Sequence, residues 1–311
     1  MKFNILITAF PFVNDYKKLK NFFNNHNFNI RIVKTRQSLK EKDLLKLVKN
    51  IDGILCGDDE FTEKVIKKAS KLKVLSKWGT GIDSIDLKAC KNFNVKVYNT
   101  PGAFTESVAT QALAFILNFN RKILSNHNNI QKGIWNKFEG STLIKKKVGI
   151  IGLGNIGLRI AELLIPFKCR IFGNDIKKIN KKKAKKAKII IKNKRFIYQN
   201  SDIIILATDL NYTTQHLINL KLSKLIKKKP LLVNIARGPI IEEKALIFLL
   251  KKEIIKGACL DVFENEPLAL KSKLKKFNNV ILTSHNAFNT VEEVNKVHYN
   301  TYKNLILGLK N

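Results

Sequence analysis

Three glycines in the segment VGIIGLGNIG (148–157) constrain the fold of this chain more than any other feature. They have the spacing G-x-G-x-x-G, follow an apolar run of strand length and precede a helical pattern of apolar residues over 160–164. In such a unit Gly152 makes the tight turn, Gly154 lets the backbone approach a pyrophosphate, and Gly157 lets the helix pack closely on the strand. The helix start offers unpaired N–H groups to phosphates. The segment therefore predicts a dinucleotide site.

An acidic residue at the expected distance supports this prediction. Asp175 stands 23 residues after Gly152, at the end of the next apolar segment (170–175). A carboxylate there accepts hydrogen bonds from the adenosine ribose and repels the 2′-phosphate of NADP. We therefore expect NAD as the cofactor, although the neighbouring Lys177 and Lys178 weaken the discrimination against NADP.

Apolar runs of strand length alternate with helical patterns along the whole chain, which is typical of α/β folds with parallel sheets. The first series of predicted strands is 3–8, 30–33, 53–57, 74–77 and 95–99, and the second is 148–152, 170–174, 187–191, 202–207, 231–236, 257–262 and 280–283. Pro101-Gly102 separates the two series. We expect one parallel sheet from each series, with the second forming the doubly wound, dinucleotide-binding half.

Three helices can be placed from local signals. Ser38 and Glu41 have the spacing of a capping box, followed by apolar residues over 44–48. Residues 105–124 read as one long helix, and a second capping box at Thr290 and Glu293 opens a last helix that runs to about Leu309.

Composition places the chain among globular proteins. It has 311 residues, of which 45% are hydrophobic, so it can bury a sizeable core and has the length of about two domains. No run approaches the roughly 18 apolar residues of a membrane span, and the start MKFNILITAFPF lacks a signal-peptide pattern, so we expect a cytoplasmic protein with no membrane association. The cysteines (Cys56, Cys90, Cys169 and Cys259) are scattered, which favours buried free thiols over disulfides or a metal site.

The charge balance is strongly basic: 58 Lys and Arg against 24 Asp and Glu give a net charge of +34. Such a balance raises nucleic-acid binding as a possibility. However, the lysines are spread along the chain, and the densest cluster (177–188) lacks the interleaved aromatic residues of a base-stacking surface. We expect no specific nucleic-acid partner; an affinity that survives physiological salt would support the alternative.

Three polar residues follow predicted strand ends in the second half of the chain, where ligands bind in open parallel sheets. Arg237 lies in NIARGP (234–239), where a guanidinium at a glycine turn can hold a substrate carboxylate. Glu266 lies in DVFENEP (261–267), and His285 lies in TSHNAF (283–288), where a histidine is suited to take the proton of an alcohol and a carboxylate partner would orient it. Taken singly, each of the three has a more usual structural role: a loop arginine is usually a surface charge, a glutamate before proline a helix or turn acid, and a lone histidine a structural residue.

Over nearly its full length the chain resembles a known family, the D-isomer-specific 2-hydroxyacid dehydrogenases. Among them it most closely resembles members described as phosphoglycerate dehydrogenase-like. The segments that carry the resemblance are KWGTGIDSIDL (77–87), NTPGAFTESVA (99–109), VGIIGLGNIG (148–157), NIARGPIIEEKAL (234–246), GACLDVFENEP (257–267) and TSHNAF (283–288). The resemblance implies hydride transfer between NAD and C2 of a D-2-hydroxy acid. It also implies a Rossmann-type cofactor domain (99–288), a smaller flavodoxin-like substrate domain (1–98) and a C-terminal helix (289–311) that returns to the latter.

The resemblance also assigns roles to residues. His285 would be the acid/base, Glu266 its partner and Arg237 the substrate-carboxylate ligand, with Gly79 in the loop that receives the substrate. Cofactor contacts would come from Thr80, Gly152, Gly154, Asn155, Ile156, Gly157, Asp175, Thr208, Ile235, Ala236, Arg237, Asp261, His285 and Ala287. The small-molecule partner would be a 2-hydroxy or 2-keto acid, the long helix from Thr105 would join a homodimer, and no metal is implied.

One departure bears on the substrate. Phosphoglycerate dehydrogenases commonly place basic residues where this chain has Asp58, Asp59 and Glu60, and three acids facing a phosphate would repel it. The regulatory extension of many of those enzymes is also expected to be missing after Asn311. We therefore expect a small unphosphorylated keto acid such as hydroxypyruvate or glyoxylate. Phosphoglycerate dehydrogenase activity and a non-catalytic, NADH-sensing interaction protein remain as alternatives.

Overall fold

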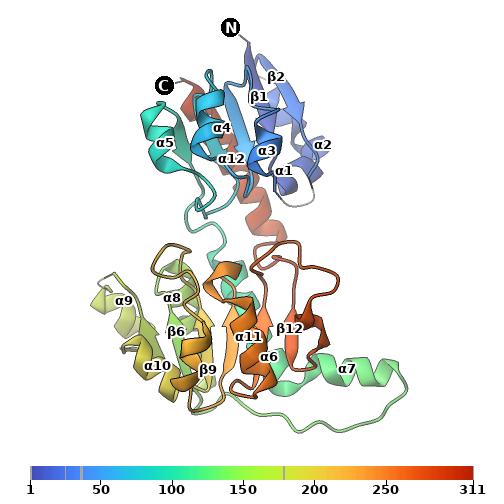
Figure 1. Cartoon of the computed structure of the whole chain (residues 1–311), viewed down its shortest axis with the longest axis vertical. Coiled ribbons are helices and arrows are strands. Elements are labelled where there is room, and N and C mark those ends of the chain that lie inside the picture. The colour runs from blue at the N-terminus through green and yellow to red at the C-terminus, as the bar shows by residue number, and fades with distance from the viewer. Residues whose placement is uncertain (1, 25, 36–37, 178, 311) are drawn as a thin grey trace. The chain divides into compact units, whose positions relative to one another are not determined.

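The structure is a computed structural model that describes residues 2–24, 26–35, 38–177 and 179–310. The chain divides into two compact units, one formed by residues 1–104 and 289–311 and the other by residues 105–288 (Figure 1). Each unit contains one sheet whose strand pairings are parallel, and each is described separately below.

The first unit has a five-stranded sheet in the order β2-β1-β3-β4-β5. Its strands are β1 (Phe3–Ile7), β2 (Phe28–Ile32), β3 (Gly53–Cys56), β4 (Val74–Lys77) and β5 (Lys96–Tyr98). Its helices are α1 (Phe10–Asn14), α2 (Tyr16–Leu19), α3 (Glu41–Leu44), α4 (Glu63–Lys68), α5 (Leu87–Asn92) and α12 (Val291–Lys310). The strand order is that of flavodoxin-like folds, as expected from the resemblance.

The C-terminal helix α12 belongs to this first unit and packs against β3, β4 and β5. The approach is close because glycine stands at the contact: a Cβ atom added to Gly308 would lie 2.3 Å from Val74 Cγ2. Likewise, a Cβ atom on Gly53 would lie 2.7 Å from Leu305 Cδ1. The last helix therefore completes the core of the N-terminal sheet.

The second unit has a seven-stranded sheet in the order β12-β11-β10-β9-β6-β7-β8. Its strands are β6 (Lys147–Ile151), β7 (Arg170–Asn174), β8 (Ile189–Ile191), β9 (Ile203–Leu206), β10 (Leu231–Asn234), β11 (Gly257–Leu260) and β12 (Val280–Leu282). Its helices are α6 (Thr105–Arg121), α7 (Ile123–Gln131), α8 (Asn155–Leu164), α9 (Lys181–Lys186), α10 (Lys194–Asn200) and α11 (Glu243–Lys251). The order reverses between β6 and β9, which is the topological switch point of a Rossmann fold.

All twelve predicted strands are present, and the α/β fold with two parallel sheets is confirmed. The central strands β9, β10 and β11 are buried along their whole length. Parallel strands covered on both faces read as continuous apolar runs, which is why the sequence pattern located them.

Two helix predictions were wrong in detail. The helix from Thr105 ends at Arg121, because Lys122 adopts a left-handed conformation (φ 56°) and a separate helix α7 follows. The capping box at Ser38 does not form: α3 begins at Glu41 with Lys40 as its N-cap residue and no side-chain cap hydrogen bond. The carboxylate of Glu41 instead accepts a hydrogen bond from the Thr62 hydroxyl (2.6 Å).

The cysteines are free thiols, as expected, and Cys56, Cys90 and Cys259 are buried. Cys169 differs from the prediction because it is partly exposed, next to the first residue of β7. No helix within the described residues is long and apolar enough to cross a membrane.

Candidate active site

The three proposed catalytic residues follow three neighbouring strands of the second sheet. Arg237 follows β10, Glu266 follows β11 and His285 follows β12, and these strands lie side by side in the order β12-β11-β10. Because the strands are parallel, their carboxyl ends share one edge of the sheet, which is where ligands bind in this class of fold. The topology therefore brings the predicted residues to the same edge.

His285 and Glu266 form a hydrogen-bonded pair. The Nδ1 atom of His285 lies 2.8 Å from Oε2 of Glu266, and the other carboxylate oxygen accepts the main-chain N–H of Phe263 (2.9 Å). The two side chains are 19% and 20% exposed, so a small ligand can reach them. A carboxylate at Nδ1 selects the tautomer with the proton on Nδ1 and stabilises the imidazolium form.

The backbone at His285 is held by a buried acid. His285 has a left-handed conformation (φ 52°), which non-glycine residues adopt rarely, and its N–H donates to the Asp261 carbonyl (2.7 Å). Asp261 is only 1% exposed. Its Oδ1 accepts the Thr283 hydroxyl (2.6 Å) and the Asn286 N–H (2.9 Å), and its Oδ2 accepts the Ala287 N–H (3.0 Å). Asp261 therefore fixes the loop that carries the histidine.

This role of Asp261 was not expected from the sequence, which suggested a cofactor contact. The signal that would have pointed to it is an acid directly after one strand and a polar segment, TSHNAF, after the next. A carboxylate at such a strand end has the main-chain N–H groups of the neighbouring loop within reach.

Arg237 lies on a turn that is braced by buried groups. The buried Asn234 side chain accepts the Ala236 N–H (3.1 Å) and donates to the Arg237 carbonyl (3.0 Å), while Nη1 of Arg237 donates to the Ala236 carbonyl (2.9 Å). A Cβ atom on Gly238 would lie 1.8 Å from the Phe263 carbonyl oxygen. Glycine at 238 thus allows the Arg237 turn to contact the segment that leads to Glu266.

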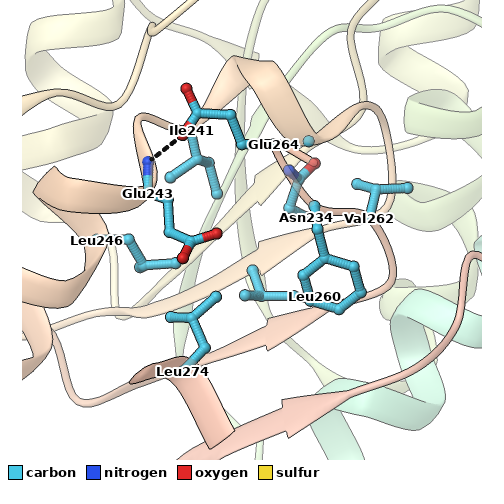
Figure 2. A pocket seen from close by; sticks show the side chains of 10 residues that line it. Asn234, Ile241, Glu243, Leu246, Leu260, Val262, Glu264 and Leu274 are labelled. Carbon is cyan, nitrogen blue, oxygen red and sulfur yellow. Dashed lines mark hydrogen bonds between the residues drawn. The ribbon is translucent and has the colours of Figure 1, made fainter. Parts of the chain in front are cut away.

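A small hollow lies beside this turn (Figure 2). Its lining residues are Asn234, Gly238, Ile241, Glu243, Leu246, Leu260, Val262, Phe263, Glu264 and Leu274. The Glu264 carboxylate accepts the Glu243 N–H (3.0 Å) and lies 2.9 Å from Nε2 of His216. Burial and the negative charge of Glu264 raise the pKa of the Glu243 carboxyl. Since His285 and Arg237 are not among its lining residues, this hollow is distinct from the His285–Glu266 pair.

The glycine motif has the geometry of a dinucleotide loop. Gly152 has φ 97°, and a Cβ atom there would lie 2.3 Å from the Ala207 carbonyl oxygen. A Cβ atom on Gly157 would lie 2.0 Å from the Gly152 carbonyl oxygen, whereas one on Gly154 would meet no protein atom within 4 Å. Gly152 and Gly157 are therefore required by the protein itself, while the open space at Gly154 fits the approach of a pyrophosphate.

The first turn of α8 and the end of β7 complete the expected cofactor site. Helix α8 begins at Asn155 with Gly154 as its N-cap residue, so its free N–H groups lie within the glycine motif. The Asp175 carboxylate accepts the N–H groups of Leu153 (2.7 Å) and Lys177 (2.8 Å), which places it against the glycine loop. Each carboxylate oxygen has a second lone pair for a ribose hydroxyl. Lys178 lies outside the described residues.

The other expected site residues fall at strand or helix ends. Thr208 follows β9, and its nitrogen lies 2.7 Å from the Cβ position of Gly152. Ile235 and Ala236 connect β10 to Arg237, Asn155 and Ile156 begin α8, and Ala287 lies on the Asp261-held loop. Gly79 and Thr80 follow β4 in the first unit, where Gly79 has φ 115°. Within the described part of the chain, no group of three or more His, Cys, Asp or Glu side chains is arranged to hold a metal ion.

The acidic segment 58–60 does not have the structure that the substrate prediction assumed. The Asp59 carboxylate is buried and accepts hydrogen bonds from the Thr8 hydroxyl and the N–H groups of Leu39 and Gly57; burial raises its pKa. Glu60 pairs with Lys40, which lowers the pKa of its carboxyl. The expectation of three acids facing one ligand was therefore wrong.

Of the three acids, Asp58 alone pairs with a residue at the carboxyl end of β4. Its Oδ1 lies 2.9 Å from Nζ of Lys77, whose side chain is 4% exposed, while that of Asp58 is 42% exposed. Lys77 Nζ also donates to the Trp78 carbonyl (3.0 Å) and lies 3.6 Å from the Cβ position of Gly79. The buried cation beside the Gly79 loop is thus paired directly with Asp58, and its charge also acts on the neighbouring Asp59.

Comparison with known proteins places this site in a family. The sequence model described as "D-isomer specific 2-hydroxyacid dehydrogenase, NAD binding domain" matches residues 113–287. The chain is 34% identical over 281 residues to the glyoxylate reductase of Thermofilum pendens, covering 86% of this chain and 81% of that protein. It is also 34% identical over 264 residues to the D-3-phosphoglycerate dehydrogenase of Methanocaldococcus jannaschii, covering 84% of this chain but 50% of that protein.

A solved structure supports the same assignment at the level of the fold. The D-lactate dehydrogenase of Aquifex aeolicus, in complex with NAD and lactic acid, is similar with a TM-score of 0.88 at 24% identity, over 99% of this chain and 96% of that chain. These similarities favour an enzyme over an NADH-sensing or a nucleic-acid-binding protein. The chain belongs to the D-isomer specific 2-hydroxyacid dehydrogenase family and is an NAD-dependent oxidoreductase of 2-hydroxy acids.

Proposed function

We propose that His285 is the acid/base of this enzyme, that Glu266 orients it, and that Arg237 binds the carboxylate of a small 2-keto acid. The observation that carries this proposal is the 2.8 Å contact between Nδ1 of His285 and the Glu266 carboxylate at the ligand-binding edge of the sheet. A general acid/base must have its reactive nitrogen held in one orientation, and this contact provides that orientation.

The chemistry divides between the cofactor and the protein. When bound, NAD accepts the hydride of the alcohol, and NADH supplies it to the keto acid. With Nδ1 held by Glu266, Nε2 of His285 donates a proton to the keto oxygen during reduction and accepts the hydroxyl proton during oxidation. The guanidinium of Arg237 holds the carboxylate through two N–H donors. The main chain at Gly79 is also proposed to bind the substrate.

The cofactor is proposed to lie along the glycine motif and the carboxyl ends of the strands in the second unit. The residues proposed to hold it are Thr80, Gly152, Gly154, Asn155, Ile156, Gly157, Asp175, Thr208, Ile235, Ala236, Arg237, Asp261, His285 and Ala287. Asp261 acts chiefly through the loop that it fixes, since its carboxylate already accepts three hydrogen bonds from that loop. In this assignment residues 99–288 are the cofactor domain and residues 1–98 the substrate domain.

We infer that the substrate is unphosphorylated, with glyoxylate and hydroxypyruvate as first candidates. Several of the matching relatives are named glyoxylate reductase or hydroxypyruvate reductase. In addition, Asp58 neutralises Lys77, the buried cation beside the Gly79 loop, so this cation is not available to a phosphate.

We also propose that the enzyme is a cytoplasmic homodimer. Large apolar side chains are exposed on α7 and the segment after it, which leave the body of the second unit (Figure 1). They are Ile123, Leu124, Ile130, Ile134, Trp135 and Phe138. Exposed apolar side chains gathered on one segment mark a site of protein–protein contact, and a second copy of this chain is the proposed partner. Free cysteines fit a reducing compartment.

The proposal is tested by following NADH oxidation with glyoxylate, hydroxypyruvate, pyruvate and phosphohydroxypyruvate. His285→Ala is expected to lower kcat about 10²–10⁴-fold, the usual contribution of a general acid/base, while NADH binding is kept. His216→Ala is the matched control, because His216 also pairs with a glutamate, at 2.9 Å, in the same unit. Equal losses of kcat in both variants would contradict the assignment, as would an unchanged kcat in His285→Ala.

A further inference from the structure

A buried histidine outside the acid/base pair contacts the residue next to Gly79. His298 on α12 has no exposed surface, and its Nδ1 accepts the indole N–H of Trp78 at 3.0 Å. Its Nε2 lies 3.2 Å from Oδ2 of Asp15, which connects α1 to α2. The hydrogen bonds thus join three segments of the first unit that are far apart in the sequence.

These contacts determine the protonation state of His298. An indole N–H only donates, so Nδ1 of His298 must be the unprotonated ring nitrogen, and Nε2 carries the proton that it donates to Asp15. The hydrogen bond to Trp78 therefore exists only in the neutral imidazole. If Nδ1 gains a proton, two N–H groups face each other and the bond is lost.

The surroundings favour the neutral form. Burial lowers the pKa of His298 below its ordinary value of 6.5, against the opposing effect of Asp15, and Lys18 lowers it further. Lys18 lies 3.3 Å from Asp15. The charged residue that β4 contributes next to Trp78 is Lys77, and its ammonium group is already paired with Asp58 at 2.9 Å. Phe12 packs on the imidazole edge-on, with ring centroids 5.0 Å apart, so an added charge on His298 would meet an apolar ring.

Trp78 connects this histidine to the loop that begins at Gly79. Its main-chain N–H donates to the Cys56 carbonyl (2.8 Å), and its ring packs against Phe104 with centroids 5.4 Å apart. Gly79 follows with φ 115°, and its carbonyl accepts the Thr100 N–H (3.0 Å). The Trp78 side chain, held by His298 and Phe104, therefore lies directly before the Gly79 loop, whose main chain is itself bonded at Trp78 and at Gly79.

We propose that His298 is a positioning residue that, as the neutral imidazole, holds Trp78 and thereby keeps Gly79 in the conformation that binds the 2-keto acid. The inference rests on the proposed function of the Gly79 loop. It makes substrate binding sensitive to pH through a group that touches neither substrate nor cofactor. As the pH falls through the range where His298 gains a proton, KM for the keto acid rises more than the Kd of NADH, because all the proposed cofactor contacts except Thr80 lie in the second unit.

The first experiment compares two variants of His298. His298→Leu removes the acceptor for the indole N–H, and we expect KM for the keto acid to rise about tenfold with kcat within about twofold, as for the loss of one buried hydrogen bond. His298→Gln keeps an acceptor and a donor, so we expect it to restore most of the wild-type KM without the increase at low pH. An unchanged KM in His298→Leu overturns the proposal. So does a rise in KM that is matched by an equal fall in kcat in both variants.

The second experiment reads the hydrogen bond directly and does not depend on turnover. The chain has two tryptophans, of which Trp78 is buried and Trp135 is 83% exposed, so a Trp135→Phe background reports Trp78 fluorescence alone. A protonated imidazole in contact quenches an indole, so the emission is expected to fall with acid at a midpoint below 6.5, the ordinary pKa of histidine. In this background His298→Gln is expected to abolish the titration, and KM is expected to rise over the same range as the emission falls.

The two experiments separate the inference from the function on which it rests. If the wild-type enzyme reduces keto acids but the Trp78 emission does not titrate, or titrates without a change in KM, the proposal for His298 is wrong and the proposed function stands. If Trp78 titrates as expected but no 2-keto acid is reduced, the proposed function is wrong, and with it the role of His298 in substrate binding.

Discussion

Replacing Asp261 with Asn tests whether the loop that carries His285 is held as the structure shows. The carboxylate accepts hydrogen bonds from the Thr283 hydroxyl and from the N–H groups of Asn286 and Ala287. An asparagine side chain has one oxygen, and its NH₂ group only donates. Whichever way the amide is turned, its nitrogen faces one of the two main-chain N–H groups, so Asp261→Asn loses at least one of these bonds.

The size of the effect follows from the kind of bond that is lost. A hydrogen bond to a charged group contributes about 1.5–3 kcal/mol, and the mismatch leaves a buried N–H without an acceptor. At about 2–4 °C per kcal/mol for a domain of this size, we expect the Tm of Asp261→Asn to fall by roughly 5–10 °C. Because the loosened loop carries His285, kcat for the keto acid should fall by about 10–100-fold, as expected for misplacement of a reacting group.

The assay combines Tm, kcat and the Kd of NADH, with Asp202→Asn as the control. Asp202 also accepts a main-chain N–H, from Lys147 at 2.8 Å, but at the amino end of β9, away from the ligand-binding edge. We expect Asp202→Asn to lower Tm with kcat unchanged. A normal kcat in Asp261→Asn would refute the reasoning. A raised Kd for NADH with normal kcat would instead favour the direct cofactor contact that the resemblance implies.

Four further substitutions test other parts of the proposal. Glu266→Gln removes the charge that stabilises the imidazolium, so the pH profile of keto-acid reduction should move toward acid; an unmoved profile would rule out Glu266 as the partner. Asp175→Ala should raise the kcat/KM ratio of NADPH to NADH, and a wild-type preference for NADPH would contradict the role of Asp175. Asp58→Asn frees the Lys77 cation and should raise kcat/KM for phosphohydroxypyruvate relative to hydroxypyruvate by at least about threefold, with Glu60→Gln as the control. Ile130→Asp should shift the sedimentation coefficient from dimer to monomer, and a wild-type monomer would refute the dimer.

The features that could be predicted from the sequence are those set by short segments. The strand β9 is the run IIIL, buried on both faces, and a run of this kind is visible without knowing its neighbours. The glycine motif is also visible in one short segment, because Gly152 has a positive φ and Gly157 contacts the Gly152 carbonyl five positions away; the contact of Gly152 with Ala207 is not visible in that segment. His285 and Glu266 were identified because both follow strand ends, although the pairing itself came from the family resemblance.

The features that could not be predicted depend on contacts between distant segments. The apolar pattern of the helix from Thr105 continues through Ile123 and Leu124, so periodicity alone gives no sign of the left-handed residue Lys122. Trp78 and His298 are 220 positions apart, and their hydrogen bond forms because α12 packs against β4. No sequence motif contains both residues, so the sequence alone gives no reason to connect them.

The acidic segment 58–60 shows why the number of charged residues in a sequence segment does not give the charge of the surface that contacts a ligand. The segment 58–60 follows the end of β3 and begins in a bend, and its three side chains have separate partners, so the three adjacent acids do not share one surface. Here Asp58 pairs with Lys77, Asp59 is buried against Thr8, and Glu60 pairs with Lys40. The proposed discrimination against a phosphorylated substrate therefore depends chiefly on the pair of Asp58 and Lys77 rather than on three exposed negative charges. It follows that a single uncharged replacement at Asp58 should change substrate preference, whereas the same change at Glu60 should leave it as it is.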